Sequence, residues 1–127
     1  MAKFYRCNHC GNILSSIKDS GVVPVCCGSP MTELIPDSVD AAFEKHVPVV
    51  EVTDSVVEIY VGEVAHPMIE AHYIEWIALE TNHGICIKYL QPDDEEASHS
   101  FALAEFEKPV CAYAYCNLHG LWKKSIR

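Results

Sequence analysis

The chain lacks the features that mark membrane proteins and nucleic-acid-binding proteins. Its 127 residues contain no run of about 18 apolar residues, the length that a membrane-spanning helix needs. Residues 1–6 show no apolar core of a signal peptide. Positive charge is scarce, because 9 Lys and Arg stand against 18 Asp and Glu, for a formal net charge of −9. We therefore expect a cytoplasmic protein that binds neither membranes nor nucleic acid.

Internal repeats and low-complexity tracts are also missing, and the cysteine count is not even. Half of the residues are hydrophobic and 21% are charged, which is typical of a chain that folds. The seven cysteines are an odd number. In a reducing compartment such a count favours metal binding or catalysis over disulfide bonds.

Four of the cysteines lie close together near the start of the chain. Cys7 and Cys10 form a Cys-x-x-Cys pair followed by Gly11, which lets the backbone turn back toward the sulfurs. Fifteen residues later come Cys26 and Cys27, whose Cα atoms are about 3.8 Å apart, too close for an unstrained disulfide. The segment is too short to bury a core. We therefore predict that one metal ion, bound by all four thiolates, holds it folded.

A domain boundary is predicted near Pro36, where turn-forming residues cluster and the composition changes. It separates a metal module of residues 1–36 from a domain of residues 37–127. Directly after it, Ser38 is expected to cap a short helical turn over residues 39–42.

Because Val47 precedes a proline, it is expected to begin a strand. Glu44, Lys45 and His46 are then expected on the loop in front of that strand. On its own, such a polar triplet is more often a solvated loop than a functional site.

The larger domain has the pattern of short β-strands separated by turns. Strands are predicted over residues 49–53, 56–61, 72–80, 85–90, 100–106 and 110–115. A number of short strands close to the seven of the typical fold indicates an antiparallel β-sandwich. In the strand over 72–80, simple alternation places His72, Ile74 and Trp76 on one face. Cys86 and Cys111 also fall on strands, where we expect them to be small buried hydrophobic residues.

Further metal-ligating residues are spread over three loops of this domain. Cys116 and His119 lie on a turn after an apolar run, where a thiolate and an imidazole can close on one metal ion. His46, His66 and His72 lie at loops or strand edges. Each alone is more often a satisfied polar residue than a ligand, but together they indicate one shared site.

These motifs, in this order, resemble the desulfoferrodoxin family, the two-iron form of superoxide reductase. The resemblance covers essentially the whole chain. It rests on these segments: Cys7-x-x-Cys10 with Cys26-Cys27, Glu44-Lys45-His46-Val47-Pro48, His66-Pro67-Met68, His72-Tyr73-Ile74-x-Trp76-Ile77, and Tyr115-Cys116-Asn117-x-His119-Gly120-x-Trp122.

The resemblance implies an all-β protein with two iron ions. A small desulforedoxin-like module would hold one iron through Cys7, Cys10, Cys26 and Cys27. An immunoglobulin-like antiparallel β-sandwich would hold the second through five ligands: His46, His66, His72 and His119 as equatorial imidazoles and Cys116 as the axial thiolate. Glu44 would match the carboxylate that occupies the sixth position in the ferric state, and Lys45 the lysine beside it.

The implied activity is the one-electron reduction of superoxide to hydrogen peroxide without release of oxygen. Four imidazoles and a thiolate leave one position open on an octahedral metal, as a catalytic metal requires. Because the chain is acidic, a lysine at that position would supply the local attraction for an anionic substrate. The resemblance further implies re-reduction by rubredoxin or a similar donor, and a homodimer.

Two other interpretations use the same residues. A β-sandwich with a Cys-x-x-His loop is also typical of blue-copper electron carriers, but those usually have a methionine just after the histidine, where this chain has Gly120-Leu121-Trp122. A structural zinc module joined to a binding sandwich is the other. Neither explains why Glu44 and Lys45 directly precede His46.

Overall fold

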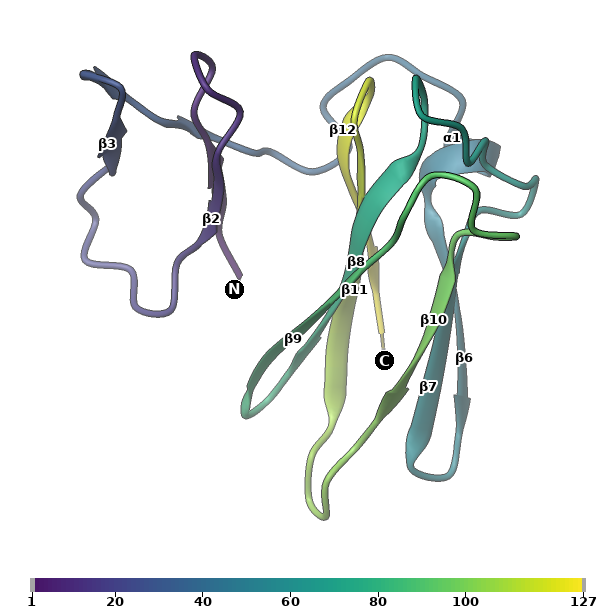
Figure 1. Cartoon of the computed structure of the whole chain (residues 1–127). Helices are drawn as coiled ribbons and strands as arrows, with labels where there is room; N and C mark the ends of the chain where they lie inside the picture. Colours follow the sequence, from purple (N-terminus) through teal and green to yellow (C-terminus); the bar gives the residue numbers. More distant parts are fainter. Residues whose placement is uncertain (1, 127) are drawn as a thin grey trace. The chain divides into compact units, whose positions relative to one another are not determined.

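The structure, a computed structural model, describes residues 2–126 and divides into two compact units (Figure 1). Unit 1 is Met1–Ile35 and unit 2 is Pro36–Arg127. In both units the regular elements are almost all β-strands. Among the described residues the only helix, α1, spans Phe43–His46, and no helix there is long and apolar enough to cross a bilayer.

Unit 1 consists of very short strands around a small apolar cluster. Its main sheet is antiparallel, in the order β2-β1-β5, with β1 at Phe4–Arg6, β2 at Ile13–Ser15 and β5 at Thr32–Glu33. A separate two-stranded ladder pairs β3 (Val25–Cys26) with β4 (Ser29–Pro30). The buried cluster consists of Tyr5, Cys7 and Met31, against which Cys26 packs. Two of these four residues are cysteines, so little apolar burial remains to hold the unit together.

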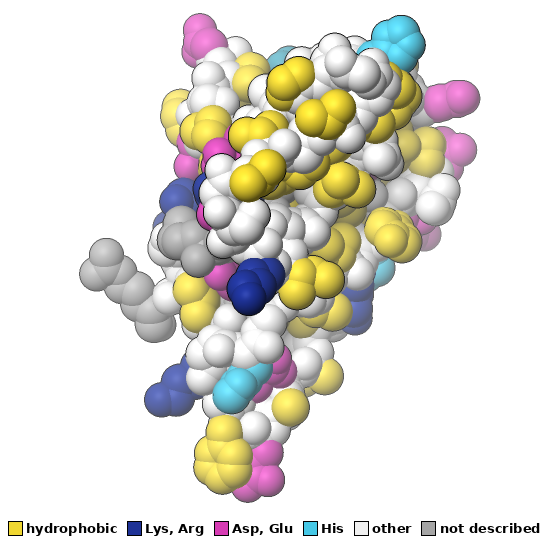
Figure 2. All heavy atoms as spheres, turned by 90° about the vertical axis from the view of Figure 1, so that its left-hand side faces the viewer, with side chains coloured by type: hydrophobic (Ala, Val, Ile, Leu, Met, Phe, Trp, Pro, Cys, Tyr) yellow, Lys and Arg dark blue, Asp and Glu magenta, His cyan; other side chains and the backbone are white. Residues whose placement is uncertain are grey.

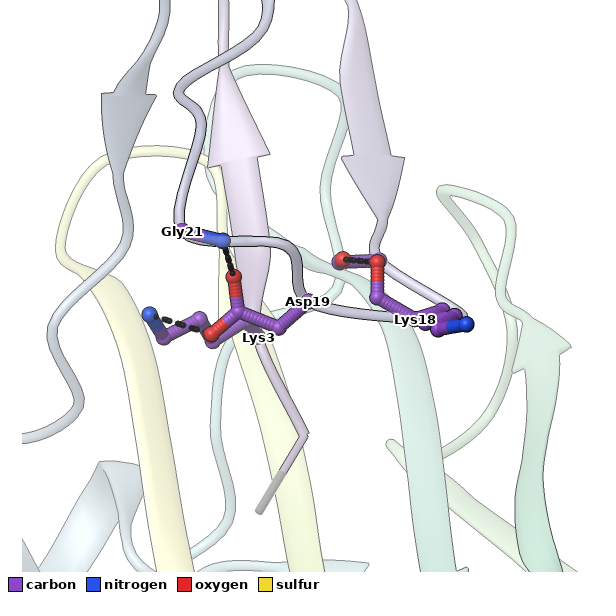
Figure 3. Close-up of polar contacts among 5 residues, drawn as sticks. Lys3, Lys18, Asp19 and Gly21 are labelled. Atoms are coloured by element: carbon purple, nitrogen blue, oxygen red, sulfur yellow. Dashed lines mark hydrogen bonds and ion pairs between the residues drawn. The ribbon is translucent and has the colours of Figure 1, made fainter.

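The loop between β2 and β3 is tied to the start of the chain by polar contacts at the surface (Figure 3). The Asp19 carboxylate accepts a hydrogen bond from the Gly21 N–H at 2.8 Å and forms an ion pair with Lys3 at 2.9 Å. The Ser16 hydroxyl donates to the Lys18 carbonyl at 3.3 Å. The ion-paired side chains are 34% and 42% exposed, so water screens the pair and it stabilises the unit little.

Unit 2 is a sandwich of two antiparallel sheets (Figure 1). One sheet has the order β10-β7-β6, with β6 at Pro48–Thr53, β7 at Val56–Val61 and β10 at Ser98–Ala102. The other has the order β12-β11-β8-β9, with β8 at Ile74–Thr81, β9 at Gly84–Tyr89, β11 at Pro109–Cys116 and β12 at Gly120–Ser125. The predicted antiparallel sandwich is confirmed.

The apolar core lies between the two sheets. Its buried members come from both layers: Val57, Ile59 and Phe101 from the first, and Ile77, Leu79, Ala112, Ala114 and Cys116 from the second. Branched and small residues alternate with outward-facing positions along these strands, as expected for a sheet buried on one face. This core does not depend on any metal ligand except Cys116.

The predicted faces of β8 were wrong at its start. Ile74 lies in the same core cluster as Ile77 and Leu79, and not on the face of Trp76. The cause is a β-bulge: β8 advances two residues, from Ile74 to Trp76, while β11 advances one, from Cys116 to Tyr115. The extra residue, Glu75, reverses the alternation.

Three further expectations need correction. The helical turn lies at 43–46 and not at 39–42, and its N-cap, Ala42, makes no side-chain cap bond. Strand β12 follows the Cys116–His119 turn, where no strand was predicted. Cys86 is exposed because it lies on β9, an edge strand, whereas Cys111 is buried as expected.

Candidate metal centres

The four cysteines of unit 1 converge at its knuckle and at the β3–β4 turn. Their sulfurs all lie within 4.8 Å of one another. The Cys10 and Cys26 sulfurs are 3.7 Å apart, and those of Cys26 and Cys27 are 4.0 Å apart. All four are free thiols. A metal ion about 2.3 Å from four sulfurs at tetrahedral corners separates them by about 3.8 Å, so the spacing fits a bound metal.

The pKa values of these cysteines also favour the binding of a cation. The backbone N–H groups of Cys10 and His9 point toward the Cys7 sulfur, and the Cys10 N–H is the largest cause that lowers the pKa of Cys7, to about 6. Contacts with the Cys10 and Cys7 sulfurs raise the pKa of Cys27 to about 12. Four thiolates this close together repel one another unless a metal ion neutralises them.

In unit 2, two buried imidazoles face each other through atoms that carry lone pairs. His46 Nδ1 lies 2.7 Å from the Ala42 carbonyl, and His66 Nδ1 lies 2.7 Å from the Pro67 carbonyl. Each Nδ1 therefore carries the proton, which leaves both Nε2 atoms as acceptors. These two Nε2 atoms are 3.2 Å apart. With these tautomers neither Nε2 can donate to the other, and a cation bound by both atoms would satisfy the two lone pairs.

Burial keeps both rings neutral. It is the main reason why the pKa of His46 is lowered and that of His66 falls to about 4. The nearby histidines lower both values further. Neutral imidazole is the form that binds metals.

His72, Cys116 and His119 complete the cluster. The ligand atoms of these three and of His46 all lie within 4.8 Å of one another. His119 presents Nδ1, which lies 3.1 Å from His46 Nε2 and 3.8 Å from the Cys116 sulfur. Nitrogens bound at right angles to one metal at about 2.1 Å lie about 3.0 Å apart, which matches the short contacts. His66 stands outside this group of four but contacts it through His46.

Two atoms of the cluster are otherwise hard to explain. His72 Nε2 is buried and has no hydrogen-bond partner, a costly state for a polar atom. The Cys116 side chain is completely buried; burial raises the pKa of its thiol, and the N–H groups of Leu118 and His119 oppose this. A metal bound here would satisfy the nitrogen and stabilise the thiolate.

Helix α1 brings Glu44 and Lys45 to the same cluster. Both side chains are exposed, whereas His46, the next residue, is buried. The positive charge of Lys45 contributes to the lowered pKa of His46 and of His72, in both cases after burial and the charge of His119, and for His72 also after that of His46. The charge of Glu44 acts on His46 in the opposite direction.

The backbone of α1 is fixed by the segment that follows β7. The Val64 N–H donates to the Glu44 carbonyl at 2.8 Å. A Cβ atom at Gly62 would lie 2.6 Å from the Glu44 carbonyl oxygen and 2.9 Å from the Lys45 carbonyl carbon. Because these are backbone atoms, any side chain at residue 62 would push α1 away from its position.

Trp122 contacts two of the predicted ligands. Its ring stacks on His46 at 5.0 Å between centroids, and Phe43 meets it edge-on at 5.3 Å. Its Nε1–H donates to the His119 carbonyl at 3.0 Å. The ring therefore orients one ligand by stacking and another through its backbone.

The remaining cysteines and histidines lie outside both clusters. His9 is exposed in the knuckle, beside a complete set of four sulfurs. The His99 Nε2 atom lies 2.8 Å from the Tyr89 carbonyl and joins β10 to β9. A blue-copper centre does not fit the cluster of unit 2, because such centres use two histidines, and four imidazoles meet here.

Comparison with known proteins decides the family. The sequence profile described as "Desulfoferrodoxin" matches residues 38–125, and that described as "Desulfoferrodoxin, N-terminal domain" matches residues 1–34. This chain belongs to the desulfoferrodoxin family. The desulfoferrodoxin of Nitratidesulfovibrio vulgaris is 44% identical over 95% of this chain and 94% of its own length. That of Syntrophotalea carbinolica is 45% identical over 93% of this chain and 91% of its own.

Solved structures agree. The superoxide reductase of Treponema pallidum has 36% sequence identity and a TM-score of 0.83, and the match covers 98% of this chain and 99% of that one. A one-iron superoxide reductase from Giardia intestinalis has 35% identity and a TM-score of 0.59, and the match covers 66% of this chain and 98% of its own. The two clusters match the two iron centres of a desulfoferrodoxin, so the cofactors are two iron ions.

Proposed function

We propose that this desulfoferrodoxin is a superoxide reductase, which reduces superoxide to hydrogen peroxide by one electron without releasing oxygen. The observation that carries the proposal is the convergence of four imidazoles and one buried cysteine sulfur beside the exposed Lys45. In this assignment His46, His66, His72, His119 and Cys116 hold the catalytic iron. Cys7, Cys10, Cys26 and Cys27 hold the other.

Bound ferrous iron would supply the single electron, and superoxide takes up that electron and two protons to become hydrogen peroxide. Five donors are one fewer than an octahedral iron accepts, which leaves a position for a small anion. As a thiolate ligand, the buried Cys116 would donate electron density to the iron, which would favour release of the product. Low exposure around Cys116 keeps water away from the sulfur.

Lys45 is proposed to attract the substrate and to hold a proton at Nζ near the open position. The protein as a whole carries a formal charge of −9 and repels anions, so attraction has to come from a local cation. The effect of the Lys45 charge on His46 and His72 supports its placement there. A developing peroxide would accept a hydrogen bond from this ammonium.

Glu44 is proposed to act in the resting state only. It is exposed on α1 next to Lys45, and a carboxylate is a good ligand for ferric iron. In that role it would occupy the open position after oxidation and leave it when the iron is reduced again.

The finer partner assignments are also proposals. A rubredoxin-like protein would return the electron, and exposed apolar side chains next to the ligands, at Phe43, Ile69 and Leu118, would suit its docking. A homodimer is supported by apolar side chains on unit 1, where Ile17, Val22 and Val25 are 99%, 75% and 68% exposed; Figure 2 shows hydrophobic side chains gathered on the face in view. A cytoplasmic location is proposed from the free thiols.

Product stoichiometry tests the function directly. The chain, purified without oxygen and loaded with iron, is mixed with a known amount of superoxide in the presence of a reductant. A reductase forms one hydrogen peroxide per superoxide consumed and no oxygen. A dismutase forms one hydrogen peroxide and one oxygen for every two superoxide ions, and that result would refute the proposal. Metal analysis of the same sample separates iron from copper and zinc.

A further inference from the structure

Strand β8 is flanked at its two ends by the same arrangement of hydrogen bonds, made each time by an asparagine. Before β8, Asn117 donates its backbone N–H to the Tyr73 carbonyl at 3.2 Å and accepts the Tyr73 N–H at Oδ1 at 3.0 Å. Its Nδ2 donates to the carbonyl of Ala71, two residues earlier, at 3.1 Å. One planar amide thus bonds to the residues on both sides of His72.

Asn82 repeats this pattern just after β8. It donates its N–H to the Lys108 carbonyl at 3.0 Å, accepts the Lys108 N–H at 2.7 Å, and donates from Nδ2 to the Phe106 carbonyl at 3.4 Å. The residue between its partners is Glu107, which accepts a hydrogen bond from the Thr81 hydroxyl at 2.8 Å. This end of β8 carries no metal ligand, and it lies opposite the end that carries α1 (Figure 1).

The two asparagines therefore make the same three kinds of hydrogen bond, but the segments that they hold differ. His72 and Ile69 exchange both backbone hydrogen bonds, at 3.1 and 2.9 Å, so His72 sits in a small hairpin of its own. The regular pairing of β8 with β11 is interrupted by the bulge at Glu75, opposite Cys116. Asn117 lies in the same turn as Cys116 and His119, and its side chain joins this turn to the hairpin.

We propose that Asn117 is a positioning residue for the iron centre, whose amide fixes His72 relative to Cys116 and His119. The buried His72 Nε2 has no hydrogen-bond partner, so the backbone has to place that atom. The amide does so through residues 71 and 73, whose positions fix the direction of the His72 side chain. The inference rests on the proposed iron site but not on its reaction with superoxide.

Release of iron to an excess of a ferrous chelator, without oxygen, tests the proposal in the full chain. The absorption of the iron in the four-cysteine centre is followed separately. We expect Asn117→Ala to release iron from the His/Cys centre about ten to a hundred times faster than the parent. Asn82→Ala is the matched control and should leave that rate unchanged. Both substitutions should lower the melting temperature of the metal-free protein by a similar amount, about 5 °C.

A second variant separates positioning from general support. Asn117→Asp keeps the acceptor for the Tyr73 N–H but places an oxygen against the Ala71 carbonyl, so it should release iron faster than the parent and shift the absorption of the oxidised centre. The proposal is overturned if Asn117→Ala and Asn117→Asp lower stability but leave both release and spectrum unchanged. Equal acceleration by Asn82→Ala would overturn it as well. Because no superoxide is used, failure of the proposed activity would be seen separately, in the stoichiometry assay.

Discussion

The two metal centres of this chain are built in opposite ways. The four-cysteine cluster takes its ligands from two short turns in a unit whose buried cluster has only a few side chains. The His/Cys cluster takes its ligands from three segments between His46 and His119, at one end of a sandwich with a continuous apolar core. We therefore expect that the metal holds the fold in the first case and that the fold holds the metal in the second. The distance in sequence between the ligands thus indicates whether the fold depends on the metal or the metal site depends on the fold.

Loss of one sulfur from unit 1 should have the largest effect on structure. Cys10 is exposed, so Cys10→Ser removes a ligand without disturbing a core. We expect unit 1 to lose its metal and its protection against hydrogen exchange, while unit 2 keeps its own. Hydrogen exchange followed by mass spectrometry measures the two units separately. The control is Cys86→Ser, which changes an exposed cysteine on β9.

If unit 1 of Cys10→Ser lacks metal and still has the hydrogen-exchange protection of the parent, the metal does not hold its fold. In that case the small cluster around Tyr5 and Met31 would suffice to hold the unit.

Loss of the Cys116 sulfur from unit 2 should affect the chemistry of the His/Cys centre and leave the fold of the unit intact. Cys116→Ser nearly preserves the volume of a completely buried side chain. We expect the sulfur-to-iron absorption of this centre to disappear and the rate of superoxide reduction to fall more than about 100-fold, since a direct ligand matters at least as much as its supports. Unit 2 should keep its hydrogen-exchange protection. Collapse of the β-sandwich in this variant would show that the metal centre holds the fold in unit 2 as well as in unit 1.

The structure brings the predicted ligand residues together, whereas it moves several of the predicted elements that carry them. Cys7, Cys10, Cys26 and Cys27 are close in sequence, so local geometry limits how they meet, and the structure brings them together. For His46, His66, His72 and His119 the residue pattern indicated only a shared site, because antiparallel pairing over some 70 positions brings them together; the resemblance to a known family supplied the full ligand set.

What the sequence missed depends on tertiary contacts. The bulge at Glu75 follows from how β8 pairs with β11, and a pattern of alternating residues cannot show it. Helix α1 forms at 43–46 because Phe43 packs on Trp122 and the Glu44 carbonyl is bonded by Val64. The need for a glycine at residue 62 is another such feature, visible only once the backbone of α1 lies against it.

If the fold holds the second centre, exposed residues beside it can be changed without loss of iron. Lys45→Ala tests this and the proposed steering together. We expect iron content to stay at the parent level, while the second-order rate with superoxide falls several-fold, up to about tenfold, and depends less on ionic strength. Stopped-flow or pulse-radiolysis kinetics at several salt concentrations measure both. Lys108→Ala, which removes an exposed lysine near Asn82, is the charge-matched control and should change neither.

Glu44→Ala should have the smallest effect on the reaction with superoxide. Glu44 is exposed, and the part of it that fixes α1 is its backbone carbonyl, which the substitution keeps. If the carboxylate binds only the oxidised iron, its loss should shift the absorption of the ferric centre and leave the first step with superoxide within about twofold of the parent, because ferrous iron does not hold it. Anaerobic mixing of the reduced protein with superoxide measures that first step. The absorption spectrum of the oxidised protein that forms measures the shift of the ferric centre. A large loss in the first step would instead make Glu44 a participant in the reaction. The His/Cys centre, although held by the fold, would then depend on an exposed side chain for its reaction.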